Sequence, residues 1–144
     1  MSTFKPVTPA FAVSPQISVE DVALAAAAGF KTIINNRPEG ESPDQTPGAA
    51  IAAAAAAHGL QYHALPSGMP PPPNVVERMA EVLAEAPEPV LAYCRSGTRS
   101  VTAWALAQAL EGRLAPDEII AKAAEAGYDL SGARGALEGL APKA

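Results

Sequence analysis

The chain has 144 residues, a formal net charge of −5 and one cysteine. This length suits one domain with its own hydrophobic core, so we take residues 1–144 as a single domain. The acidic balance argues against a nucleic-acid-binding surface, and a lone cysteine excludes an internal disulfide. The apolar runs are too short to span a bilayer, and the N-terminus lacks the features of a secretory signal. A free thiol suits a reducing compartment, so we expect a cytoplasmic protein that binds neither nucleic acid nor membrane.

Proline and glycine divide the chain into alternating short strands and helices. The first predicted strand begins at Phe11 and ends at Ser14-Pro15. The other predicted strands cover residues 31–35, 60–67 and 88–94. The predicted helices cover 19–30, 49–59, 75–86, 101–112, 116–127 and 131–140. This alternation predicts an α/β fold with a mostly parallel central sheet flanked by helices. Right-handed crossovers bring the loops that follow the strands to one edge, where we expect the active site.

One of these loops, CRSGTRS at residues 94–100, has the features of an anion-binding loop with a nucleophile. The free backbone N–H groups at the start of the next helix, and its dipole, attract an anion. Cys94 is the expected nucleophile, and the positive charges of Arg95 and Arg99 favour its thiolate. Gly97 permits a tight turn and a close approach of the backbone. The hydroxyl groups available to the thiolate or a bound anion belong to Ser96, Thr98 and Ser100.

Arg37 follows the predicted strand 31–35, on the same edge of the sheet. It could bind the charged part of a substrate or brace the cysteine loop. A solvated loop arginine is an equally good interpretation of this position. We therefore include Arg37 among the expected substrate-binding residues and leave its role open.

The segments around the cysteine resemble two families. CRSGTRS is similar to the active loop of single-domain rhodaneses, which read Cys-Arg-x-Gly-x-Arg. The stretches GFKTIINNRPEGE and YHALPS resemble the dual-specificity branch of the protein tyrosine phosphatase superfamily. From about Pro9 to Leu140 the chain resembles the phosphatase-like domain found at the N-terminus of beta-lactamase-hydrolase-like proteins. This resemblance implies a protein tyrosine phosphatase-like architecture. In fused relatives the partner is a persulfide dioxygenase with a metallo-hydrolase fold, which implies sulfide metabolism.

The length of the loop favours sulfur chemistry over phosphorus chemistry. The phosphatases that this chain resembles use the motif Cys-x5-Arg, in which the arginine binds two phosphate oxygens. Here Arg99 comes one residue earlier, and Ser100 stands at the clamp position. We interpret the shorter loop as a tighter nest sized for the sulfur of a persulfide. The segment YHALPSGMPPPPN, which corresponds to the general-acid loop of the phosphatases, contains no aspartate or glutamate, and sulfur transfer needs no such acid.

These arguments predict a rhodanese-type sulfurtransferase. Cys94 would take the sulfane sulfur of thiosulfate or a persulfide and pass it to an acceptor thiol or protein. The alternative is a tyrosine or dual-specificity-like phosphatase that hydrolyses a phosphate ester through a Cys94 cysteinyl-phosphate, with Arg99 reaching the substrate. A third hypothesis is a non-catalytic persulfide carrier or sensor. We predict no cofactor, and two histidines with one cysteine do not form a metal site.

Overall fold

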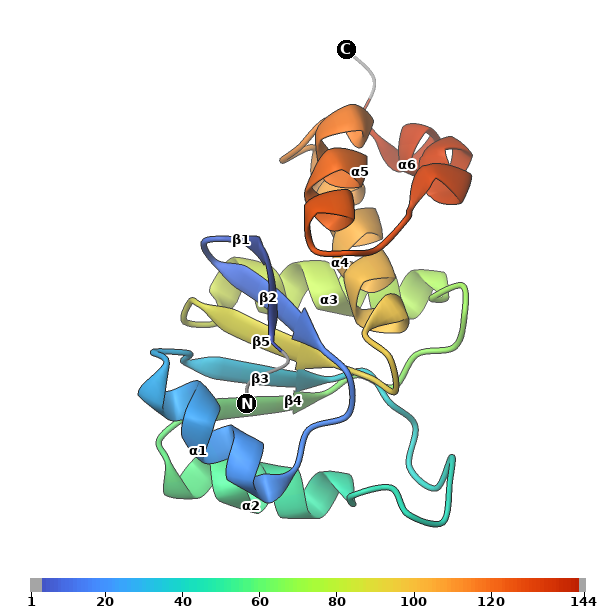
Figure 1. The fold of residues 1–144 in the computed structure, drawn as a ribbon. Coiled ribbons are helices and arrows are strands. Elements are labelled where there is room, and N and C mark those ends of the chain that lie inside the picture. Colours follow the sequence, from blue (N-terminus) through green and yellow to red (C-terminus); the bar gives the residue numbers. More distant parts are fainter. Residues whose placement is uncertain (1–3, 143–144) are drawn as a thin grey trace.

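The computed structural model describes residues 4–142, which form a central sheet with helices on both faces (Figure 1). The strands of this part are β1 (Lys5–Thr8), β2 (Phe11–Ser14), β3 (Thr32–Asn35), β4 (Gln61–Ala64) and β5 (Val90–Tyr93). Their order in the sheet is β1-β2-β5-β3-β4. β2, β5, β3 and β4 pair in parallel, and β1 pairs antiparallel with β2. The mostly parallel α/β sheet predicted from the sequence is therefore confirmed.

The helices form two groups on opposite faces of the sheet. They are α1 (Val19–Ala27), α2 (Gly48–Ala57), α3 (Pro73–Glu85), α4 (Thr98–Glu111), α5 (Pro116–Glu125) and α6 (Arg134–Leu140), the last preceded by a 3₁₀ turn, η1 (Ser131–Ala133). α1 and α2 cover one face, while α3 and α4 cover the other and α5 and α6 pack on α4 (Figure 1). Each predicted helix is present, with ends that differ by a few residues.

The strand β1 was not predicted from the sequence. It is only four residues long, KPVT, and lies at the edge of the sheet. Lysine and proline are unusual inside a sheet but tolerated in an edge strand, because one side of that strand has no partner. The composition of this segment therefore gave no strand signal.

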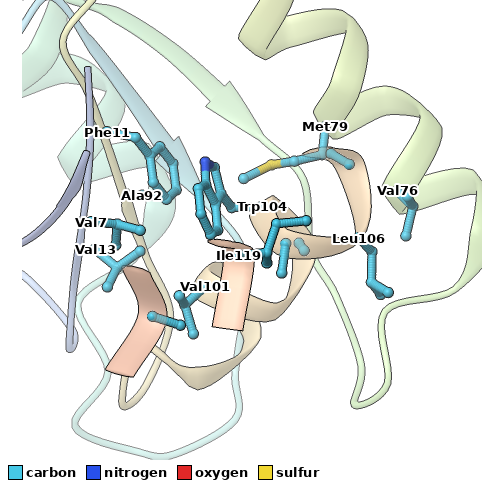
Figure 2. Packing of buried hydrophobic residues seen from close by; sticks show 14 of the residues in the cluster. Val7, Phe11, Val13, Val76, Met79, Ala92, Val101, Trp104, Leu106 and Ile119 are labelled. Atoms are coloured by element: carbon cyan, nitrogen blue, oxygen red, sulfur yellow. The ribbon is translucent and has the colours of Figure 1, made fainter. Parts of the chain in front are cut away.

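The core between the sheet and α3–α6 is organised around Trp104 of α4. The Trp104 and Phe11 rings stack with centroids 5.7 Å apart and planes 9° apart. Figure 2 shows Trp104 beside Phe11, with Met79 of α3 and Ile119 of α5 close by. This packing fixes α4 against the sheet, as expected from the spacing of its apolar residues, and so fixes the cysteine loop from which α4 begins.

The register of the strands aligns the loops that follow them. Tyr93 at the end of β5 pairs with Ser14 of β2 and Asn35 of β3, and Asn35 pairs with Ala64 of β4. The four strands therefore end in one row across the sheet. The segments that follow, including the cysteine loop, emerge from this single edge, as right-handed crossovers require.

Candidate active site

Cys94 directly follows β5 and is fully buried. The backbone N–H of Gly97 donates a hydrogen bond to its Sγ atom over 3.1 Å. Gly97 has a φ of 96°, in the left-handed region that suits glycine, and immediately precedes the first residue of α4. The chain thus curls around the sulfur and enters the helix at once. The glycine turn and the helix start expected after Cys94 are therefore present, and anion binding by this loop stays a prediction.

Tyr128, which follows α5, holds this loop from outside. Its hydroxyl donates a hydrogen bond to the carbonyl oxygen of Ser96 over 2.9 Å. The same hydroxyl lies so close to Gly97 that a Cβ atom there would overlap it. Burial, and to a lesser extent the nearby charge of Cys94, raises the pKa of Tyr128, so the phenol stays a neutral donor. Tyr128 was not among the predicted site residues, because it lies 32 positions from Ser96 in the sequence.

Arg99 is close enough to interact electrostatically with Cys94, although it stands one residue earlier than in Cys-x5-Arg. Its Nη1 and Nη2 atoms donate to Oε2 and Oε1 of Glu41 over 2.7 and 2.9 Å, and Nη1 also donates to the carbonyl oxygen of Ser67 over 3.2 Å. The hydrogen bonds to Glu41 chiefly raise the pKa of Arg99, and the neighbouring Cys94 raises it further. None of these three hydrogen bonds uses the Nε–H group of Arg99. That donor and the second Nη2 hydrogen remain for an anion at the loop.

Glu41 joins Arg99 to Arg37. The Nε atom of Arg37 donates to Glu41 Oε1 over 2.8 Å, and its Nη1 atom donates to Gln16 Oε1 over 2.9 Å. Only 4% of the Arg37 side chain is exposed, so it is not a solvated loop arginine. The hydrogen bonds from Arg99 and Arg37 lower the pKa of Glu41 to about 2. The result is an Arg37–Glu41–Arg99 bridge from the loop after β3 to the cysteine loop.

The remaining predicted residues lie in the same loop with different surroundings. Ser96 is exposed, and its hydroxyl donates to the Thr98 hydroxyl over 3.0 Å. Arg95 is also exposed. Ser100 is fully buried, and its hydroxyl has no hydrogen-bond partner among residues 4–142. Ser100 is thus enclosed in the first turn of α4, whereas Arg99 is bonded to Glu41 and interacts with Cys94.

Two acidic residues of the loop after β3, Glu41 and Asp44, are ionised at neutral pH. Glu41 has the low pKa given above. The Ser42 hydroxyl donates to Asp44 Oδ1 over 2.7 Å, and this hydrogen bond is the main cause that lowers the pKa of Asp44. Neither side chain can therefore protonate a leaving group in this arrangement. Glu41 and Asp44 therefore do not replace the general acid missing from the segment 62–74.

Residues 4–142 contain neither a cluster of metal-ligating side chains nor a membrane-spanning helix. No group of three or more His, Cys, Asp or Glu side chains in this range is arranged to hold a metal ion. No helix in the described part of the chain is long and apolar enough to cross a membrane.

Residues 3–111 match the family model of the beta-lactamase hydrolase-like protein, phosphatase-like domain. The chain belongs to this family. A beta-lactamase hydrolase-like protein of Agrobacterium fabrum is 35% identical over 127 residues, which make up 88% of this chain and 30% of the relative. One from Xylella fastidiosa Temecula1 is 34% identical over 83% of this chain and 28% of its own length. The chain thus spans less than a third of the curated relatives it matches.

Solved structures support the same assignment. A candidate phosphatase from Neisseria meningitidis Z2491 is 33% identical, with a TM-score of 0.84 over 97% of this chain and 99% of that one. The catalytic core of the phosphatase SIW14 from S. cerevisiae is 17% identical and shares the fold, with a TM-score of 0.68 over 95% and 84% of the two chains. The architecture is that of the protein tyrosine phosphatases, as the sequence resemblance implied, and the chain is a phosphatase-like protein.

The prediction of a sulfurtransferase is wrong. The family match and the solved structure at 33% identity are both of the phosphatase type. The persulfide carrier depends on the same sulfur chemistry and is abandoned with it. The error came from the length of the loop. Counting residues placed Ser100 at the clamp position, whereas in the folded loop Arg99 lies beside Cys94 and Ser100 is buried.

Proposed function

We propose that this protein is a cysteine-dependent phosphomonoester hydrolase. The observation that carries the proposal is the convergence of a thiol, a helix N-terminus and a braced arginine in residues 94–99. Free N–H groups at the start of α4 bind phosphate oxygens, and the helix dipole favours their negative charge. The unused Nε–H and Nη2–H of Arg99 can hold two phosphate oxygens in the bidentate manner.

The reaction proceeds in two displacements. The Cys94 thiolate attacks phosphorus, and the bond between phosphorus and the ester oxygen breaks, so that the alcohol leaves with the bonding electron pair and takes a proton from water. Water then attacks the cysteinyl-phosphate, and the P–S bond breaks to release phosphate and restore the thiolate. Arg99 and the loop N–H groups stabilise the charge on the transferring phosphoryl group in both steps.

The surroundings of the loop restrict the substrate. Because Glu41 and Asp44 are ionised, the first step relies on a leaving group that needs little protonation, such as a phenol. Arg95, exposed at the loop, adds positive charge that attracts the phosphate dianion. A thiol nucleophile must also stay reduced, so we keep the cytoplasm as the proposed location.

The test is hydrolysis of para-nitrophenyl phosphate by the wild-type protein and by Cys94→Ser. We expect the variant to lose about a thousandfold or more in kcat/KM, because serine is a far weaker nucleophile in a site without a general base. Ala56→Ser, which adds a serine at an exposed position of α2 on the face of the sheet opposite α4, is the matched control and should keep wild-type activity. Equal hydrolysis by wild type and Cys94→Ser would refute the proposal.

A further inference from the structure

An apolar groove lies along α4, beside the cysteine loop. It consists of two hollows of about 310 and 370 Å³, which share Pro70, Leu106 and Ala136 in their linings. Because these three residues belong to both hollows, we treat them as one groove and call it the α4 groove. Its sides are the proline-rich segment 69–73 and the segment 129–140, and its floor is α4.

The floor of the α4 groove starts at the cysteine loop. Thr98, Thr102, Leu106 and Leu110 line it at intervals of four residues. Side chains at this interval lie on one face of a helix. From Thr98 to Leu110 the stripe extends about 18 Å along the axis of α4. Thr98 is also the first residue of that helix, so the end of the groove coincides with the anion-binding end of α4.

The side formed by the proline-rich segment is also tied to the cysteine loop. The carbonyl oxygen of Ser67 accepts a hydrogen bond from Arg99. Met69, two residues later, lines the hollow nearer the loop, and its side chain is 57% exposed. Arg99 therefore holds the backbone two residues before Met69, which forms the mouth of the α4 groove.

The lining of the groove suits an apolar group and repels an anion. Leu106 and Leu130 are 6% and 5% exposed, and they give a packed apolar surface. The Thr102 hydroxyl donates to the carbonyl oxygen of Thr98 over 2.7 Å, so its hydrogen is already used within the helix. The charged side chains in the lining are Glu77 and Asp129, both acidic. A phosphate is therefore directed to the cysteine loop and not into the groove.

We propose that the α4 groove binds the apolar body of the substrate whose phosphate occupies the cysteine loop. The substrate class is a phosphomonoester of an elongated, apolar alcohol or phenol, as opposed to a small polar metabolite. This inference rests on the proposed phosphatase function. One molecule can span both sites because they meet at Thr98, and each buried methylene adds to its affinity.

The test uses phenyl phosphate and 4-alkylphenyl phosphates with chains of up to about eight carbons, below their aggregation concentrations. For the wild-type protein kcat/KM should rise about two- to fourfold per methylene. Ala136, an exposed residue of α6, lines both hollows, and Ala136→Phe fills the groove. In this variant kcat/KM should no longer rise with the length of the alkyl chain. Ala121→Phe, at an exposed position of α5, is the matched control and should keep the wild-type rates and gain.

Each outcome decides between the two proposals. If hydrolysis of phenyl phosphate depends on Cys94 but kcat/KM does not rise with chain length, the groove does not bind the substrate. The proposal of a phosphatase would then still hold. A gain that survives unchanged in Ala136→Phe would also overturn the proposal for the groove. Absence of hydrolysis for every ester, in a folded protein, would remove both proposals. If Ala136→Phe does not fold, Met69→Asp at the exposed mouth replaces it, with the same loss of gain expected.

Discussion

Glu41 determines how Arg99 faces the thiol. It occupies both terminal nitrogens of Arg99 and is itself held by the buried Arg37. An arginine side chain has considerable rotamer freedom, and this bridge removes it before any substrate binds. We infer that Glu41 is a positioning residue: it acts through Arg99 without touching the phosphate.

Glu41→Gln should lower kcat of aryl phosphate hydrolysis about tenfold, with a smaller change in KM, because the orientation of Arg99 matters most in the transition state. The ratio of wild-type to variant kcat should stay constant between about pH 5 and pH 8, since Glu41, with a pKa of about 2, is ionised throughout. Steady-state kinetics at several pH values measure both quantities.

The matched control is Glu81→Gln, which breaks an exposed ion pair with Arg78 on α3 and should leave kcat unchanged. Two results would contradict a positioning role for Glu41. A lower KM in Glu41→Gln would mean that Glu41 competes with the substrate for Arg99. A loss that varies with pH would mean that Glu41 transfers a proton.

At the scale of elements, the cysteine loop was predictable because its signals are local. A buried strand, a glycine and a helix start all lie within a dozen residues of Cys94, so their spacing alone predicts an anion-binding loop. The residues that hold this loop are distant in sequence. Glu41 is 58 positions from Arg99, and Tyr128 is 32 positions from Ser96. With a single sequence nothing links such positions, and only the folded structure shows these contacts.

The same limit explains the error about the chemistry. The number of residues between Cys94 and an arginine was used to predict where the arginine lies. The position of a guanidinium group also depends on the side-chain rotamer and on its hydrogen-bond partners. Glu41 and Ser67 fix these for Arg99, and neither belongs to the loop. The helices and the four parallel strands were predicted, because proline, glycine and apolar periodicity are read within one segment. The edge strand β1 was missed, since KPVT gave no strand signal.

Gly97→Ala should disrupt the cysteine loop in two ways. The backbone has a positive φ there, which costs a residue with a Cβ about 1–2 kcal/mol, and the added methyl group overlaps the Tyr128 hydroxyl. We expect kcat/KM for aryl phosphates to fall by about a hundredfold or more. Unfolding in denaturant, followed by fluorescence of Trp104, the only tryptophan, should show the loss of stability.

Gly139→Ala in α6 is the control, because a Cβ there meets nothing within 4 Å and φ is not positive. Tyr128→Phe separates the two effects, since it removes the overlapping hydroxyl along with its hydrogen bond to Ser96. Combined with Gly97→Ala it should relieve part of the overlap but not the strain in φ. Full activity in Gly97→Ala alone would show that the loop tolerates another conformation.

At the scale of the whole molecule, the C-terminal helices complete the core. Ile119, Ala123 and Leu137 of α5 and α6 are fully buried in the cluster that contains Trp104. Tyr128, which braces the cysteine loop, also belongs to this part of the chain. The family match ends at residue 111, before Ile119, Ala123, Tyr128 and Leu137. We therefore propose that residues 1–144 form one domain and that the site depends on the segment that follows residue 111.

A chain that ends at Glu111 should lose its cooperative unfolding transition. Removing α5 and α6 exposes the apolar face of α4 and deletes several fully buried side chains, at a cost of more than about 5 kcal/mol, which is comparable with the whole stability of a small domain. Thermal melts followed by circular dichroism test this, and a chain that ends at Pro142 is the control because it keeps every described contact. If the chain 1–111 melted cooperatively and hydrolysed aryl phosphates, the domain would end at residue 111 and Tyr128 would be dispensable. If the chain 1–111 does not melt cooperatively, α5 and α6 are part of the folded enzyme. Tyr128, which lies between these helices and donates a hydrogen bond to Ser96, then connects them to the loop that holds Cys94.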